Sequence, residues 1–197
     1  MRTFAALLPP AEALDQLADT IGPLRRHPAG ERLRWADRED WHITLAFFGE
    51  TEGSQLPVLY EGLADVARDA EPFSLRLVGG GAFGRRHLWA GVAGDLEPLT
   101  RLAFASAGAG RAAGAPGGTV HDAYRPHLTL ARNRDRNGDL DHWLARLAGF
   151  EGGAWTADSL VLMRSEDAVD GAGGTRYRTQ ASWPLGGPWP LGGPMKR

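Results

Sequence analysis

The chain has 197 residues, of which 43% are hydrophobic and 23% are charged, and its formal net charge is −2. A chain of this length can bury a substantial core, in one large domain or in two small lobes. Cysteine is absent, which excludes disulfides, zinc–cysteine sites and a thiol nucleophile. The balanced charge argues against a protein that holds long nucleic acid by charge alone, because such domains are usually strongly basic.

The predicted elements alternate irregularly between strands and helices. In chain order we predict a strand at 3–8, a helix at 10–22, a short extended piece at 33–36, a strand at 41–48, a helix at 55–70, strands at 73–78 and 88–92, a helix after Asp95, a strand at 127–131, a helix at 139–147, and strands at 159–163 and 177–183. Several of the strands are close enough in sequence to form hairpins. This pattern indicates an α+β fold rather than a doubly wound parallel sheet.

Two segments are predicted to lack regular structure, and a third bears on where the protein resides. Residues Ala105 to Gly118 are mostly Ala, Gly and Pro, and we predict a mobile loop there. Residues 186–197 form a Gly/Pro-rich tail, which we expect to be disordered after a single domain at 1–185. The apolar run Phe4 to Leu8 is too short for a signal peptide or a membrane span, so we predict a soluble, cytoplasmic protein.

A short sequence occurs twice, and it is the most informative feature of the chain. Residues 42–46 read His-Ile-Thr-Leu-Ala, and residues 127–131 read His-Leu-Thr-Leu-Ala. Successive side chains of a strand point to opposite faces, so His42 shares a face with Thr44, and His127 shares one with Thr129. Either copy alone would fit a half-buried strand with a satisfied histidine. The two copies together indicate a shared function.

Two histidines with two hydroxyls suit phosphoryl transfer without a metal. Histidine titrates near pH ~6.5, so one ring can accept a proton while another donates one. In an in-line displacement at phosphorus, one imidazole activates the attacking oxygen and the other protonates the leaving oxygen. The threonine hydroxyls, about 7 Å along each strand from the histidines, can bind the non-bridging oxygens. We therefore expect the two strands to face one another across a phosphate.

The two histidine segments resemble the signatures of a known family. Trp35 through Glu50 and Tyr124 through Arg132 are similar to the paired motifs of the RNA 2′,3′-cyclic phosphodiesterases, also called 2′-5′ RNA ligases, which are two-histidine phosphoesterases. Gly81 to Val92 resembles the middle hairpin of that family, and Tyr177 to Trp183 resembles its closing strand. The resemblance spans roughly residues 2 to 185, which leaves out the tail.

The resemblance implies a fold and an activity. The fold would be bilobed, with pseudo-two-fold symmetry, two antiparallel-rich sheets facing across a central cleft, and helices on the outside. The reaction would open the 2′,3′-cyclic phosphate of an RNA end or short oligonucleotide to a 2′-phosphomonoester, with reversible 2′-5′ ligation as a second activity and no cofactor. By family assignment His42 would donate the proton and His127 would accept it, although the near-symmetry also allows the reverse.

Two further residues are candidates for substrate binding. Arg132 matches the arginine that follows the second motif of the family, where it would neutralise phosphate charge. Strand alternation points it away from His127, so it reaches the cleft only if the strand ends or bulges near Ala131. Phe48 has the same parity as His42, and it would either stack on a terminal base or belong to the core.

The other histidines, His27, His87, His121 and His142, lack this context, and we predict surface or packing roles for them. We predict no metal site, because the only hint of one is the pair His121-Asp122. Two alternatives to a monomeric RNA-end hydrolase remain. One is a phosphodiesterase for a small cyclic nucleotide, and the other is an RNA-end-binding module without turnover.

Overall fold

The computed structural model describes residues 1–27, 33–117, 124–133, 140–167 and 175–187. The strands in this part of the chain are β1 (Arg2–Leu7), β2 (Leu33–Trp35), β3 (Ile43–Glu50), β4 (Phe73–Phe83), β5 (His87–Gly94), β6 (His127–Asn133), β7 (Trp155–Ala157), β8 (Ser159–Asp167) and β9 (Thr175–Pro184). The helices are α1 (Ala11–Arg25), α2 (Leu56–Arg68), α3 (Leu96–Ala112), α4 (Asp141–Leu147) and the short 3-10 helix η2 (Arg38–Asp40). The predicted α+β class is confirmed.

The strands form one nine-stranded sheet in the order β7-β4-β5-β6-β3-β1-β8-β9, with β2 paired to β6. All the strand pairs in the described part of the chain are antiparallel. The two histidine strands are neighbours at the centre of this order, and they share one register pair, Ile43 with Leu128. The sequence predicted two sheets, whereas the structure has one sheet whose halves are joined at that single pair.

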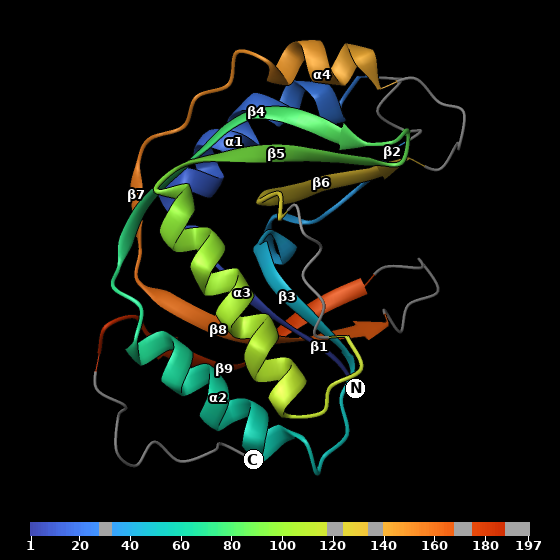
Figure 1. Ribbon diagram of the computed structural model, residues 1–197. Helices are drawn as coiled ribbons and strands as arrows, with labels where there is room; N and C mark the ends of the chain where they lie inside the picture. Colours follow the sequence, from blue (N-terminus) through green and yellow to red (C-terminus); the bar gives the residue numbers. More distant parts are fainter. Residues whose placement is uncertain (28–32, 118–123, 134–139, 168–174, 188–197) are drawn as a thin grey trace.

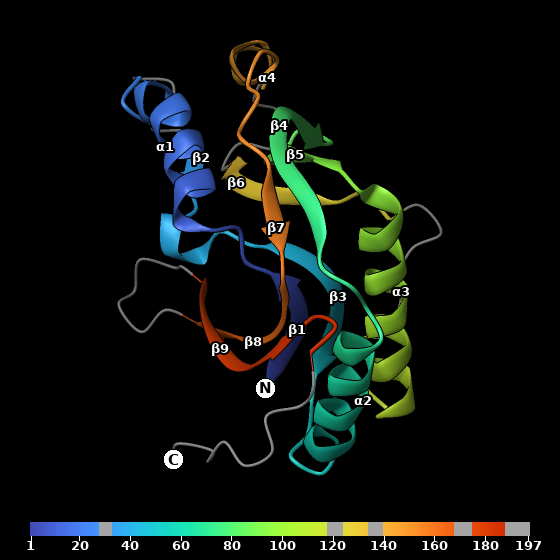
Figure 2. The same ribbon diagram turned by 90° about the vertical axis from the view of Figure 1, so that its left-hand side faces the viewer.

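The helices cover the two halves of the sheet separately (Figures 1 and 2). Helices α2 and α3 lie side by side, with α3 packed on β3 and α2 packed on β8 and β9. Helices α1 and α4 lie beyond the other half and pack against β4. Leu59, Leu63 and Ala67 are spaced four residues apart on the buried face of α2, as an amphipathic helix requires. The histidine strands are thus supported by rigid elements from both sides.

Helix α3 corrects the prediction of a mobile loop at 105–118. Residues 105 to 112 continue the helix, and Ser106, Ala107, Ala109 and Gly110 are buried in it. The small side chains permit close packing, since a methyl group added at Gly62 of α2 would lie 3.1 Å from the Ala109 side chain. The small side chains of residues 105–112 suggested that this segment could not form part of a core. In the structure they instead allow α3 to pack closely against α2. Tertiary packing has outweighed local propensity.

Two smaller points concern the ends of elements. Helix α1 continues past the predicted stop and ends at Arg25, with Pro23 inside its last turn. Two residues of the predicted tail, 186 and 187, are described. The Gly186 amide donates to the Ala67 carbonyl at 3.0 Å, and Leu185, just before the tail, is buried. The rest of the tail, residues 188–197, lies outside the described residues, as does His121. None of the described helices is both long and apolar enough to span a bilayer.

Candidate active site

His42 and His127 are held by the same local contact. His42 lies directly before β3, and its Nδ1 is 2.7 Å from the carbonyl oxygen of Asp40. His127 begins β6, and its Nδ1 is 2.8 Å from the carbonyl oxygen of Arg125. A carbonyl oxygen only accepts, so Nδ1 carries the hydrogen in both rings. Each neutral ring therefore keeps Nε2 as a proton acceptor.

Aromatic rings flank each histidine. The His42 ring lies 4.8 Å from the rings of both Phe4 on β1 and Tyr177 on β9. The His127 ring lies 4.7 Å from Phe83 on β4 and 6.1 Å from Trp89 on β5. Each half of the sheet thus supplies one imidazole together with its own aromatic neighbours.

Burial determines the charge of the two rings. Burial lowers the pKa of His42 to about 4; the hydrogen bond to Asp40 opposes this shift, and the charge of His127 adds to it. Burial also lowers the pKa of His127, and the nearby Arg125 charge acts in the same direction. Both rings are therefore neutral at pH 7 without substrate. An anion bound between them raises both pKa values, so that one ring can hold the proton a leaving oxygen needs.

A cavity of about 530 Å³ opens beside His42. Thr44 and Thr129, one from each motif, both line it. Its lining residues are Arg2, Phe4, Arg34, Trp35, Ala36, Asp37, Asp40, His42, Thr44, Phe47, Thr129, Ala131, Arg132, Ser165, Arg176 and Tyr177. The structure thus brings most of the predicted site residues to one cavity. His127 is not part of the lining, but the residues that directly follow the two histidines, Ile43 and Leu128, are register partners.

Each histidine strand has a bulge after its threonine, and this bulge determines which of the following side chains face the cavity. In β6, Leu130 is an extra residue between the pairs Trp89–Thr129 and Leu88–Ala131. The bulge buries Ala131 and returns Arg132 to the face of Thr129, where it lines the cavity. The bulge that the sequence analysis required for Arg132 is therefore present.

The same irregularity in β3 shows that the prediction for Phe48 is wrong. Leu45 is the extra residue there, between the pairs Ala5–Ala46 and Ala6–Thr44. The alternation therefore shifts by one residue, and Phe48 is fully buried in the core. Phe47 takes the place on the cavity face, with 48% of its surface exposed. Phe47 and Arg132 thus occupy equivalent positions, five residues after their histidines.

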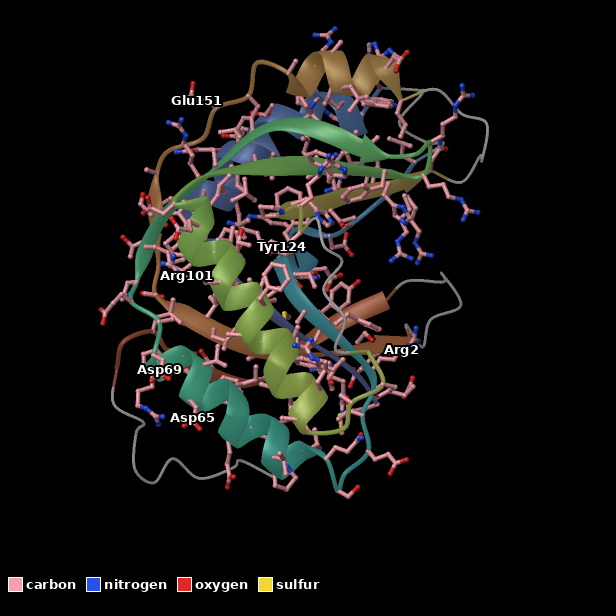
Figure 3. All side chains as sticks on the ribbon, viewed as in Figure 1. Arg2, Asp65, Asp69, Arg101, Tyr124 and Glu151 are labelled. Carbon is pink, nitrogen blue, oxygen red and sulfur yellow. The ribbon has the colours of Figure 1, made fainter. Side chains whose placement is uncertain are left out.

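Tyr124 connects the two motifs, which the sequence did not predict. Its hydroxyl donates to the carbonyl oxygen of Thr44 at 2.8 Å, across the line where the two halves of the sheet separate. Figure 3 shows Tyr124 between these halves, near the centre of the molecule. Burial raises the pKa of the Tyr124 hydroxyl, which keeps the hydrogen on the donor. The contact ties the segment before His127 directly to the strand that follows His42.

Comparisons with known proteins agree with this geometry. The sequence matches the family described as LigT-like phosphoesterase over residues 7–93 and 97–172. The chain belongs to this family. An RNA 2′,3′-cyclic phosphodiesterase of Geobacillus stearothermophilus is 30% identical over 158 residues, which are 77% of this chain. A protein of the same name from Methanothermobacter thermautotrophicus is 28% identical over 70% of this chain and 76% of its own length.

The match covers 47% of the Geobacillus protein, so this chain spans about half the length of that relative. Two solved structures share the fold. Escherichia coli LigT without ligand superposes with a TM-score of 0.73 at 23% identity, covering 93% of this chain and 96% of LigT. A protein of Thermus thermophilus superposes with a TM-score of 0.72 at 26% identity, covering 95% of this chain and 99% of that one.

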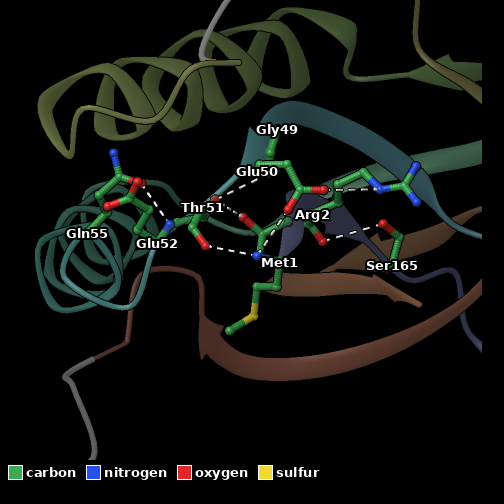
Figure 4. Close-up of polar contacts among 9 residues, drawn as sticks. Met1, Arg2, Gly49, Glu50, Thr51, Glu52, Gln55 and Ser165 are labelled. Atoms are coloured by element: carbon green, nitrogen blue, oxygen red, sulfur yellow. Dashed lines mark hydrogen bonds and ion pairs between the residues drawn. The ribbon is translucent and has the colours of Figure 1, made fainter. Parts of the chain in front are cut away.

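The cavity of this phosphoesterase carries an excess of positive charge. Four arginines and two aspartates line it, in a chain whose overall charge is −2. Arg2 is held at the rim from two sides: its Nε lies 3.5 Å from Glu50, and Ser165 donates to its carbonyl oxygen (Figure 4). The Met1 amine contacts the same carboxylate at 3.2 Å. A positive cavity in an acidic protein favours an anionic substrate.

Two of the remaining histidines agree with the prediction of surface or packing roles. His27 and His142 lie against one another and Trp143, with ring centroids of the two histidines 5.3 Å apart. His87 differs, because it alternates with buried Leu88 on β5 and so shares the face of Trp89. Within the described residues, no three His, Asp or Glu side chains gather as metal ligands would.

Proposed function

We propose that this phosphoesterase hydrolyses the 2′,3′-cyclic phosphate at RNA ends to a 2′-phosphomonoester, without a cofactor. The observation that carries the proposal is the matched pair of histidines, each with Nδ1 bound to a carbonyl and Nε2 left for chemistry. The relatives from Geobacillus and Methanothermobacter are named for this activity. A solved structure of E. coli LigT contains 3′-AMP, a nucleotide that carries a phosphate on its ribose.

The proposed reaction is a single displacement at phosphorus. Nε2 of one histidine takes a proton from water as the water oxygen attacks phosphorus. The bond from phosphorus to the 3′ oxygen breaks, and that oxygen takes the proton from Nε2 of the other histidine. The product carries a 2′-phosphate and a free 3′ hydroxyl. The family resemblance assigns His127 as the acceptor and His42 as the donor.

The cavity residues would supply binding and charge stabilisation. Thr44 and Thr129 donate hydrogen bonds to the non-bridging oxygens, on which negative charge develops in the transition state. Arg132 adds a bidentate positive charge on the same face. Phe47 offers an exposed ring on which any terminal base can stack. The same groups can run this displacement with a 5′ hydroxyl in place of water: the 5′ oxygen bonds to phosphorus, the 3′ oxygen leaves and takes the proton, and the product is a 2′-5′ linkage, which would be ligation.

The decisive test uses two substrates in the presence of EDTA: 2′,3′-cyclic AMP and an oligonucleotide with a cyclic-phosphate end. We expect turnover of the oligonucleotide, and a loss of about 10²–10⁴ in kcat for His42→Ala and for His127→Ala. His142→Ala, on the outer helix α4, is the matched control and should retain full activity. Cleavage of the mononucleotide alone would indicate a small-nucleotide enzyme, and tight binding with cleavage of neither would indicate a binding module.

A further inference from the structure

One row of side chains runs from Arg132 in the cavity to two residues, Phe83 and His87, that the reaction above does not use. Phe83, His87 and Arg132 are direct register partners across β4, β5 and β6. We call these three residues the hairpin row. Neighbouring strands lie about 4.8 Å apart, so the row extends about 10 Å from its aromatic end to its guanidinium end.

The hairpin row faces the reaction centre. The Phe83 ring lies edge-on to His127 at 4.7 Å and tilted against Trp89 at 5.4 Å, yet 37% of Phe83 remains exposed. Arg132 lines the cavity at the other end of the row. Phe83 therefore offers an accessible ring beside His127, whereas Phe4, the phenyl ring beside His42, is only 3% exposed.

Positive charge gathers at this row. Arg86 precedes His87 on the chain, and Arg132 is the register partner of His87. Burial lowers the pKa of His87, and the charges of Arg132 and Arg86 act in the same direction, so the positive charge here belongs to the two arginines. Two exposed arginines outside the row are paired, Arg76 with Glu151 and Arg101 with Glu97, and Figure 3 labels Glu151 and Arg101. Within the described residues neither Arg86 nor Arg132 forms an ion pair with a carboxylate.

The backbone holds this charge in place. The Asn133 amide donates to the Arg86 carbonyl at 2.7 Å, and the Asn133 side chain donates to the Arg85 carbonyl at 3.1 Å. The end of β6 is thus fastened to the turn between β4 and β5. The two arginines at this end of the row are therefore carried by segments that hydrogen bonds hold together.

We propose that the hairpin row and Arg86 form a second nucleotide subsite, which binds the nucleotide adjoining the reacting phosphate. Its base stacks on Phe83, and its phosphate contacts Arg86, His87 and Arg132. A basic surface combined with an aromatic platform is the composition of single-stranded nucleic-acid sites. The subsite rests on the proposed function, and it makes an oligonucleotide a better substrate than a mononucleotide.

The first test compares a nucleoside 2′,3′-cyclic phosphate with a dinucleotide that has the same cyclic end. We expect the wild-type protein to favour the dinucleotide by about tenfold or more in kcat/KM. Arg86→Ala and His87→Gln should each reduce that preference about three- to tenfold, mainly through KM. Arg101→Ala on α3 removes an equally exposed arginine and should leave the preference intact. Equal kcat/KM for the two substrates in the wild-type protein would overturn the subsite.

The second test measures binding alone, so that it does not depend on turnover. A labelled single-stranded RNA tetramer with a 3′-phosphate is titrated into the His42→Ala/His127→Ala protein at several salt concentrations. Loss of one phosphate contact in Arg86→Ala should reduce the slope of log K against log salt by about 0.7. An unchanged slope overturns the subsite. Absence of turnover in the first test with a reduced slope here would overturn the proposed reaction and leave the subsite standing.

Discussion

The buried imidazole of His42 makes the stability of the protein depend on pH. Its pKa is lowered from 6.5 to about 4 in the folded protein, chiefly by burial. The unfolded chain therefore binds this proton more readily than the folded chain. The contribution of a neutral His42 is complete above about pH 6.5, falls as the pH is lowered, and is gone below the folded pKa of about 4. At 1.36 kcal/mol per pKa unit, the total loss is about 3 kcal/mol.

The variant His42→Gln isolates this effect, because its amide is neutral at every pH and can still donate to the Asp40 carbonyl. We expect urea unfolding to show that the wild-type protein loses stability relative to His42→Gln by about 1.4 kcal/mol per pH unit between pH 6.5 and 4.5. His142→Gln removes an exposed histidine on α4 and serves as the control, so its curve should follow that of the wild type. Parallel curves for the wild type and His42→Gln would refute the argument that burial keeps this ring neutral.

Three further predictions test the site. Phe47→Ala should raise KM about 5- to 100-fold through loss of stacking, with little change in stability, whereas Phe48→Ala should lower the free energy of unfolding by about 3–5 kcal/mol; the reverse pattern would contradict the bulge in β3. Tyr124→Phe should lower stability by about 1 kcal/mol and reduce kcat more than KM, since it removes only the hydroxyl that bonds the Thr44 carbonyl; unchanged kcat would exclude a positioning role. Gly81→Ala should reduce kcat and change tryptophan fluorescence, because a methyl group there would lie 2.1 Å from the indole beside the second histidine; wild-type fluorescence would show that the indole does not need this space.

The sequence predicted the histidine pair because a repeated motif needs no knowledge of the fold. It predicted that His42 and Thr44 share a face, since a single residue of strand separates them, and both line the cavity. The cavity position predicted for Phe48 was wrong because we extended the alternation of strand side chains across a bulge. No residue type in the sequence indicates that bulge. A bulge in the other histidine strand, β6, was considered for Arg132, because the family resemblance implied a cavity position and strand alternation pointed the side chain away.

Other features could not be predicted because they depend on distant partners. Tyr124 and Thr44 are 80 residues apart, and their contact requires the two strands to separate just after Ile43 and Leu128. His87 looked like a surface residue because its register partners, Phe83 and Arg132, are known only once the hairpin is paired. The helical state of residues 105 to 112 depends on a facing glycine in α2.

The twin bulges have a consequence for redesign. Each histidine strand places one side chain on the cavity face five residues after its histidine: the phenyl ring of Phe47 in β3 and the guanidinium of Arg132 in β6. Both bulges turn their side chain toward one cavity, so under the proposed function the base-stacking ring and the phosphate-binding guanidinium occupy interchangeable positions. Exchanging them, as Phe47→Arg with Arg132→Phe, should exchange these two binding roles within the cavity.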